Sequence, residues 1–188
     1  MKDGWQYEQP DNGLRRPDPW EVARLQDMVE VKLNCSFEMH GGSLRAIAGQ
    51  PSSLLGIPFD RPIVGYGGKT INTLRLWAAA APDYFDFQRF SSGDFVGALA
   101  ETLTAESLTR VLYPDDTTSM GQGLRFIQEY FLVACSLADI VRRFQRSNAD
   151  WNTLPEKAAL QLNDTHPSMA VPELMRILLD EAHLGWDQ

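Results

Sequence analysis

The fold of this chain is decided by the stretch Leu160-Gln-Leu-Asn-Asp-Thr-His-Pro-Ser-Met-Ala-Val-Pro-Glu-Leu-Met-Arg-Ile-Leu178. Residues 158–162 are largely apolar and predict a short buried strand, and the apolar spacing at the far end predicts an amphipathic helix. Pro172 fits that helix only near its start, where a missing N–H costs little. The polar residues 163–167 therefore form a turn between strand and helix. In α/β sheets such turns lie at the carboxyl edge, where ligands bind.

This turn carries an acid and an imidazole, Asp164 and His166, on either side of Thr165. Carboxylates and imidazoles make directional hydrogen bonds, which suits them to hold the hydroxyl groups of a ligand. The structural alternative is that Asp164 and Thr165 cap the helix while His166 packs locally. Capping and ligand contact are compatible, so both interpretations stay open.

The longest helix is predicted over residues 122–147, because two apolar stripes cover most of its circumference, as in a core helix. Residues 28–38 alternate between apolar and polar and predict a half-buried strand. Residues 43–64 contain strand candidates at Leu54, Leu55, Ile57 and Ile63-Val64, and Pro58 and Pro62 between them favour edges and loops over a central strand. The second stripe of the long helix consists of Phe126, Tyr130, Val133, Leu137, Ile140 and Phe144.

The segment Gly65-Tyr-Gly-Gly-Lys-Thr70 contains the Gly-Lys-Thr tail of a nucleotide-binding loop. A true loop has four residues between its first glycine and the Gly-Lys pair, and this chain has Ile63 at the position of that first glycine. The favoured interpretation is a flexible turn that leads into a helix over residues 71–81, with Trp77 as a packing residue. An independent nucleotide-binding α/β domain stays open as the less favoured alternative.

Composition excludes several classes of protein. A net charge of −8 argues against binding to the phosphate backbone of nucleic acid. The sequence has no apolar run long enough to cross a bilayer, and its start lacks the apolar centre of a signal peptide. Cys35 and Cys135 do not make a disulfide framework, so a reducing cytoplasm is the expected compartment. We expect no metal site and no membrane segment.

Two further segments are polar. Tyr113-Pro-Asp-Asp-Thr-Thr-Ser-Met-Gly121 is a loop between two predicted helices, and its composition is typical of a solvent-facing turn. Arg142 and Arg143 stand near the end of the long helix, where cations suit the negative end of the helix dipole.

Four motifs together resemble the α-glucan phosphorylases, the family of glycogen, starch and maltodextrin phosphorylase. They occur in the family's order and are Asn72-Thr-Leu-Arg-Leu-Trp77, Val111-Leu-Tyr-Pro114, Asp139-Ile-Val-Arg-Arg-Phe144 and Leu162-Asn-Asp-Thr-His-Pro167. The resemblance implies an α/β fold that is part of the N-terminal Rossmann-like domain of a two-domain GT-B glycosyltransferase. Residues 1–188 would form a single partial domain. Because the family's members are several times longer, we expect this chain to be an internal piece.

The resemblance also implies an activity for the full-length protein. It would be a glycogen phosphorylase, a cytoplasmic homodimer that uses inorganic phosphate to release α-D-glucose 1-phosphate from the ends of α-1,4-glucans. The family's pyridoxal phosphate is held by a lysine in the carboxyl-terminal half, outside this chain. We therefore expect no catalytic residue among residues 1–188 and no activity of the isolated chain. A non-catalytic glucan-binding module derived from the same fold is a further hypothesis.

By the same resemblance, Asp116 and Thr117 lie on a gate loop over the bound sugar. Asp164 and His166 would face the acceptor-side glucose subsite.

Tyr113 and Arg125 would lie near that subsite, with core packing and a surface ion pair as the alternatives. Arg142 and Arg143 match an arginine pair that binds the phosphate of an allosteric nucleotide in the mammalian enzymes. Two arginines do not establish that regulation here.

Overall fold

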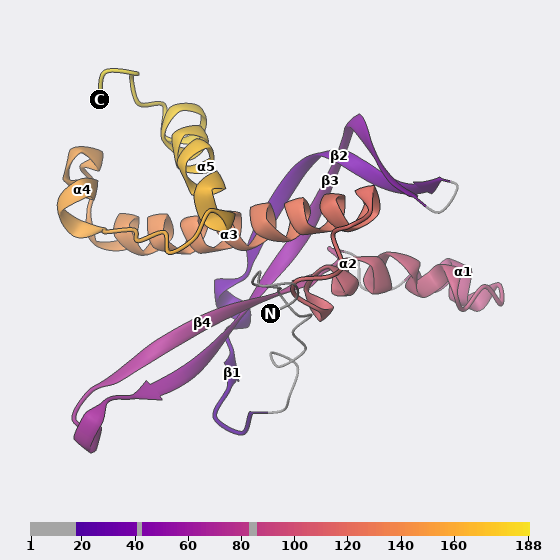
Figure 1. Cartoon of the computed structure of the whole chain (residues 1–188), viewed down its shortest axis with the longest axis horizontal. Helices are drawn as coiled ribbons and strands as arrows, with labels where there is room; N and C mark the ends of the chain where they lie inside the picture. The colour runs from indigo at the N-terminus through magenta and orange to yellow at the C-terminus, as the bar shows by residue number, and fades with distance from the viewer. Residues whose placement is uncertain (1–17, 41–42, 83–85) are drawn as a thin grey trace, which may run out of the picture. The chain divides into compact units, whose positions relative to one another are not determined.

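The computed structural model describes residues 18–40, 43–82 and 86–188 (Figure 1). The chain falls into two compact units, residues 1–128 and 129–188, and each is described by itself. The first contains the β-sheet and the second is helical, so the chain is a mixed α/β protein. The expectation of a single partial domain stays a prediction.

The sheet of the first unit is antiparallel throughout its described ladders. Leu55 and Gly56 of β3 pair with both β2 and β4, and Phe59 and Asp60 pair with both β1 and β4. Consequently β4 lies along one edge of β3, while β1 and β2 follow one another along the other. The strands are β1 Val22–Ala23, β2 Val29–His40, β3 Ser43–Val64 and β4 Ile71–Ala80, with the short helix η2 Leu25–Asp27 between β1 and β2.

The structure confirms the strand predicted over residues 28–38, which is β2. The strand candidates within residues 43–64 are confirmed, but the expectation of edges and loops is wrong, because these residues form one central strand of 22 residues. Pro58 is tolerated there because the carbonyl and amide positions of one residue face the same edge of a strand. Its carbonyl accepts a hydrogen bond from the amide of Arg24 at 2.9 Å. The missing N–H thus falls at the break between β1 and β2, away from the β4 ladder.

The helix predicted over residues 71–81 is also wrong, since this segment is strand β4. Gly67 and Gly68 have φ angles of +74° and +69°, and they reverse the chain in the short helix η3 Tyr66–Gly68. The amide of Gly65 then donates to the carbonyl of Thr70 at 2.8 Å, which closes a β3–β4 hairpin (Figure 1). A nucleotide-binding loop opens a helix, so this hairpin removes the structural context of that alternative.

Strand geometry also changes which residues of β4 share a face. Trp77 and Ala79 are buried on one face, so the structure confirms Trp77 as a packing residue. Leu74 lies on the opposite face and is exposed. Helix α2 Ala100–Arg110 is tied to this strand by its Thr109 hydroxyl, which accepts a hydrogen bond from the Ala79 amide at 3.0 Å. Between β4 and α2 lie the helices α1 Phe87–Ser91 and η4 Gly97–Leu99.

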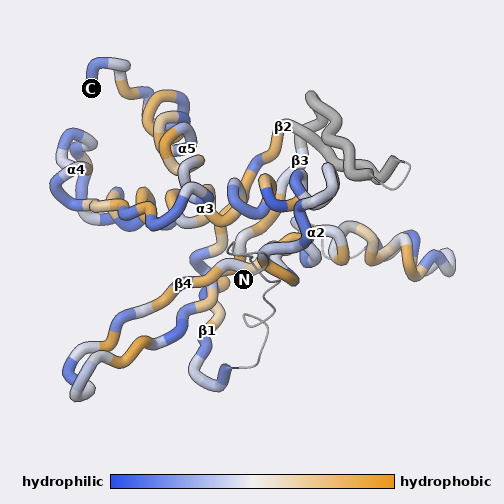
Figure 2. Tube along the Cα trace, viewed as in Figure 1, coloured by the Kyte–Doolittle hydropathy of each residue, from blue (hydrophilic) through white to orange (hydrophobic). Residues whose placement is uncertain are grey.

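The long helix predicted over residues 122–147 is confirmed as α3, Ser119–Ser147. Phe131 and Cys135 are completely buried, as expected for a core helix. The second stripe is one residue shorter than predicted, because Phe126 is 60% exposed. Hydrophobic and hydrophilic residues alternate along α3 (Figure 2). Among the residues that the structure describes, no helix has the length and apolar content needed to cross a membrane.

The second unit packs around five buried residues from the later part of α3 and from the helices after it. These are Val133, Leu137, Val141, Ala170 and Ile177, with Trp151 and Leu174 packed against them. The helix predicted to follow Pro167 is confirmed. The helices of this unit after α3 are η5 Trp151–Thr153, α4 Leu154–Lys157, η6 His166–Met169, α5 Ala170–Arg176 and the π-helical turn η7 Ile177–Glu181.

The strand predicted over residues 158–162 is wrong. Leu160 and Leu162 are 40% and 41% exposed, and this segment pairs with none of the strands β1–β4. An apolar run becomes a strand only where a neighbour pairs with its amides and carbonyls. The polar turn at residues 163–167 therefore follows an extended loop, not the carboxyl end of a parallel strand.

Candidate functional site

The candidate residues of the first unit are Tyr113, Asp116 and Thr117 on the loop 113–118 and Arg125 on α3. The loop packs on one face of α3. The first contact on this face is made by Gln128, whose Nε2 donates to the carbonyls of Leu108 and Val111 at 2.7 and 2.8 Å. These carbonyls stand at the end of α2, where the helix offers them no amide partner. Gln128 therefore joins the end of α2 to α3 just before the loop begins.

Tyr113 and Arg125 form the second contact on this face. The Arg125 guanidinium lies 4.6 Å from the centre of the Tyr113 ring, in a cation–π stack. Tyr113 has a φ of +55°, a left-handed conformation that costs a residue with a side chain about 1–2 kcal/mol. The structure thus brings these two predicted residues together in a cation–π contact.

Asp116 and Thr117 are exposed in the middle of the loop. The preceding residue, Asp115, shapes this segment by accepting the Thr117 amide at Oδ1 over 3.0 Å. That backbone hydrogen bond holds the pKa of the Asp115 carboxyl below its usual range. The sequence analysis did not assign a role to Asp115, although a turn-forming Asp two residues before its amide partner is a recognisable signal.

Asp164 and His166 are the candidate residues of the second unit, and the structure brings them together. Asp164 Oδ2 lies 3.5 Å from Nδ1 of His166, and the two side chains are 61% and 29% exposed. The other oxygen, Oδ1, accepts the amide of Thr165 at 2.6 Å. The alternative in which Asp164 and Thr165 cap the helix is not what the structure shows, because the N-cap residue of η6, Thr165, makes no side-chain cap hydrogen bond. Asp164 binds the adjacent Thr165 amide instead.

The helix after this turn is anchored by a buried acid that the sequence analysis missed. Glu173 accepts two hydrogen bonds from Arg176, from Nε at 2.9 Å and from a terminal nitrogen at 2.8 Å, and these raise the pKa of Arg176. Tyr130 of α3 donates to Glu173 at 3.3 Å, and burial, followed by the charge of Glu173, raises the pKa of Tyr130. The acid and the arginine three residues later were the available signal. This network holds α5 against α3 next to the turn.

Arg142 and Arg143 both pair with Asp139, a buried acid on the preceding turn of α3. Arg143 Nε lies 2.9 Å from Asp139 Oδ2, and Arg142 donates to Oδ1. The three side chains together carry one net positive charge. The pair therefore has a structural role within the helix, and a phosphate at this position would meet a partly neutralised site.

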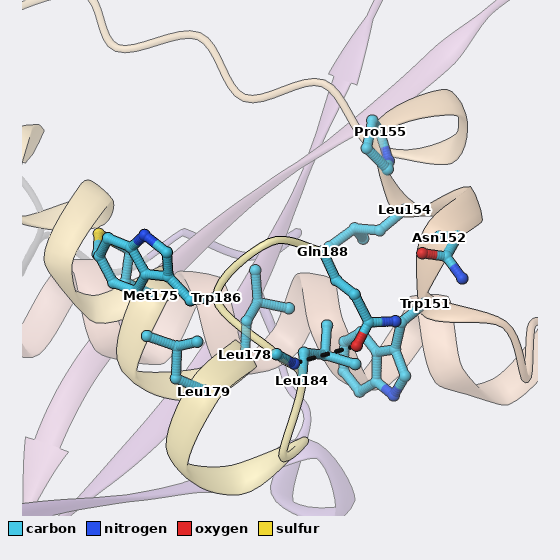
Figure 3. Close-up of a pocket in the computed structure, with 11 residues that line it drawn as sticks. Trp151, Asn152, Leu154, Pro155, Met175, Leu178, Leu179, Leu184, Trp186 and Gln188 are labelled. Carbon is cyan, nitrogen blue, oxygen red and sulfur yellow. Dashed lines mark hydrogen bonds between the residues drawn. The ribbon is translucent and has the colours of Figure 1, made fainter.

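The second unit also has a groove of about 270 Å³ between η5–α4 and the residues that follow α5 (Figure 3). Its lining is mainly apolar and contains none of the predicted site residues. Within it, the Gly185 amide donates to Oε1 of Gln188 at 3.0 Å. A sugar site needs several converging polar groups, so this groove does not fit one. The main apolar residues are Trp151, Leu154, Met175, Leu178, Leu184 and Trp186.

The described residues offer no fitting site for a metal or for the family's pyridoxal phosphate. In residues 18–40, 43–82 and 86–188, no group of three or more His, Cys, Asp or Glu could hold a metal ion. The lysines that the structure describes, Lys32, Lys69 and Lys157, are all exposed. A lysine that forms a Schiff base is desolvated or lies beside another cation, so these three do not fit the cofactor.

Known proteins that resemble this chain in sequence identify its family. A family profile described as carbohydrate phosphorylase matches residues 1–188. The chain belongs to the carbohydrate phosphorylase family. The glycogen phosphorylase of Synechocystis sp. is 46% identical over 193 residues, which cover 100% of this chain and 22% of that protein.

Two mammalian phosphorylases are similar over the same region. The liver form of glycogen phosphorylase from Ovis aries is 41% identical over 196 residues, covering 100% of the chain and 23% of that protein. The brain form from Homo sapiens is 42% identical over 193 residues, covering 98% and 23%. The chain thus spans less than a quarter of the length of these phosphorylase relatives.

Proposed function

We propose that the chain is a segment of a glycogen phosphorylase that uses inorganic phosphate to release α-D-glucose 1-phosphate from the ends of α-1,4-glucans. Support comes from membership of the carbohydrate phosphorylase family and from the similarity to glycogen phosphorylases along the chain. In this proposal the segment supplies part of a sugar cleft. The observation that carries it is the pair of the exposed Asp164 and the half-buried His166, whose side chains lie 3.5 Å apart on one turn.

This pair suits a sugar hydroxyl for a physical reason. The Asp164 carboxylate faces Nδ1 of His166, so it orients the ring and directs Nε2 to the opposite side. The turn leads directly into α5, which Glu173 anchors to α3. An oriented imidazole on a rigid helix loses little conformational entropy when it hydrogen-bonds a ligand. Asp116 and Thr117 form the proposed gate over the sugar.

The finer features of the family belong to the same proposal. The segment would be part of the N-terminal Rossmann-like domain of a two-domain GT-B fold, in a cytoplasmic homodimer. Pyridoxal phosphate would be held by residues other than the exposed lysines described above, so no step of the reaction is assigned to it here. Arg142 and Arg143 are proposed as an effector phosphate site, with Asp139 as a competing anion.

Substitution in the longer protein tests the proposal. Asp164→Ala or His166→Ala should lower kcat/KM for glucan by about one to two orders of magnitude, because a hydrogen bond to a charged group is worth roughly 1.5–3 kcal/mol. Pyridoxal phosphate content, followed by absorbance, should stay unchanged. Ser168→Ala, an exposed change on the same turn, is the matched control and should behave as wild type.

The alternatives predict different results. If Asp164 has only a structural role, its loss should appear as about 1 kcal/mol of stability with unchanged kcat/KM. Wild-type kcat/KM in both alanine variants would rule out the sugar-site role. A non-catalytic glucan-binding module would bind glucan in the longer protein and release no glucose 1-phosphate.

A further inference from the structure

Gly121, in the first turn of α3, is in unusually close contact with the loop 113–118. A Cβ atom built on Gly121 would lie 1.9 Å from the carbonyl oxygen of Asp115 and 2.8 Å from its carbon. Real Cβ atoms essentially never approach other atoms within 3.0 Å. The Asp115 carbonyl therefore occupies the space that any side chain at position 121 would need.

The amide of Gly121 also takes part in holding the loop. It donates to the hydroxyl of Thr118 at 3.1 Å, and the amide of Gln122 donates to the Thr118 carbonyl at 3.0 Å. Thr118 is thus the residue that caps α3. The loop thus meets Gly121 on two sides: Thr118 accepts a hydrogen bond from its amide, and the Asp115 carbonyl packs against it where a Cβ atom would be.

The remaining contacts of the loop leave it little freedom to move aside. Gly121, Arg125 and Gln128 are spaced by four and three residues, so they lie on one face of α3. They contact Asp115, Tyr113 and the end of α2 in turn. The segment therefore runs antiparallel to α3 and is held at both ends. To make room for a Cβ atom at position 121, the Asp115 carbonyl oxygen would have to move from 1.9 Å to beyond 3.0 Å from that atom. This movement would strain the Thr118 cap or the contact between Tyr113 and Arg125.

We propose that Gly121 is a positioning residue: its bare Cα lets the loop 113–118 lie against α3 and thereby sets where Asp116 and Thr117 meet the sugar. The last step rests on the proposed function. Asp116 and Thr117 directly follow the residue that touches Gly121, so a shift of Asp115 is passed to them along the backbone.

The chain offers a matched control two residues further along α3. A Cβ built on Gly123 meets nothing within 4 Å. Gly121→Ala and Gly123→Ala both add one methyl group near the start of the same helix, and both gain the same helix propensity. Only Gly121→Ala meets the Asp115 carbonyl, so a difference between the two variants reports on that contact.

The first test measures the position of the loop in the 188-residue chain. NMR would follow the titration of the Asp115 carboxyl and the hydrogen exchange of the Thr117 amide. In Gly121→Ala the Asp115 pKa should rise toward its usual value and Thr117 exchange should accelerate, because their hydrogen bond is disturbed. Gly123→Ala should match wild type in both. Wild-type behaviour of Gly121→Ala would overturn the proposal.

A second variant covers the case in which Gly121→Ala fails to fold. Thr118→Val removes the hydroxyl that binds the Gly121 amide and keeps the shape of the side chain. It adds no atom at position 121. The same changes at Asp115 and Thr117 are expected in it, and their absence would count against the proposal.

The second test separates the position of the loop from its role at the sugar. A misplacement of about 1 Å can cost a catalytic site up to about 100-fold, so kcat/KM for glucan in the longer protein should fall by about 10- to 100-fold in Gly121→Ala. Gly123→Ala should retain wild-type kcat/KM. If the loop signals change while kcat/KM does not, the sugar role of the loop is wrong even though the Asp164–His166 site can still stand.

Discussion

Replacing Gln128 with Met should loosen the attachment of α2 to α3. Gln128 is only 2% exposed, and its Nε2 serves two carbonyls, those of Leu108 and Val111. Its Oε1 is buried without a hydrogen-bond partner among the residues that the structure describes. Met has nearly the same length and shape, so the substitution removes the polar interactions and creates little empty space.

The magnitude follows from counting these groups. Leaving a buried carbonyl without a donor costs about 1–3 kcal/mol, and the two carbonyls at a helix end recover part of this from water, so a loss of about 2–4 kcal/mol is expected. Removing the unpartnered Oε1 returns about 1 kcal/mol. The net destabilisation of Gln128→Met is therefore about 1–3 kcal/mol.

Urea unfolding monitored by circular dichroism measures this change. Gln122→Met is the control, since Gln122 is exposed on the same helix and its change should stay within about 0.5 kcal/mol. If Gln128→Met also stays within that range with an unchanged m-value, the two hydrogen bonds do not stabilise the junction of α2 and α3.

Two further predictions concern ionisable groups. The hydrogen bonds from Arg75, with a smaller effect from Arg24, lower the pKa of Asp60, so the unfolded chain binds the proton more readily than the folded one. The stability from Asp60 is then fully present above its usual pKa of roughly 4 and is lost as pH falls through the lower folded value. Asp60→Asn should thus show a smaller loss of urea midpoint between about pH 5 and pH 2 than wild type, and an equal loss would contradict the assignment. Cys135 is completely buried, and burial raises the pKa of its thiol, so iodoacetamide should label it only after unfolding; mass spectrometry of the labelled peptides checks this.

The elements predicted correctly are those whose apolar spacing allows one interpretation. Helix α3 has 29 residues, and the two apolar stripes along it repeat at the spacing of a helix and not of a strand. The prediction of a helix at β4 was wrong because the spacing of Leu74, Leu76 and Trp77 suits a helix and a strand equally well. Its structure is decided outside the segment, by two glycines that return the chain along β3. Likewise, residues 158–162 have strand composition but no strand beside them.

The candidate site shows the same division. The sequence placed Asp164 and His166 on one turn, but the contact of 3.5 Å between their side chains was not predicted. The close contact at Gly121 could not be predicted, because Gly121 and Gly123 stand in the same helix turn and look alike in sequence. Only the path of the loop distinguishes the filled space beside one from the open space beside the other.

Pro58 has a consequence for how the sheet finds its correct pairing. Val22 pairs with Asp60 and Val29 pairs with Gly56. The seven residue steps from Val22 to Val29 therefore lie opposite only four steps along β3, and the three residues of η2 make up the difference. An odd offset exchanges the two faces of a strand. A donor at position 58 would favour extending the β1 ladder past Arg24, which would turn Val31 and Leu33 away from the buried face. Pro58 has no N–H, so it cannot donate the hydrogen bond that would extend this wrong register.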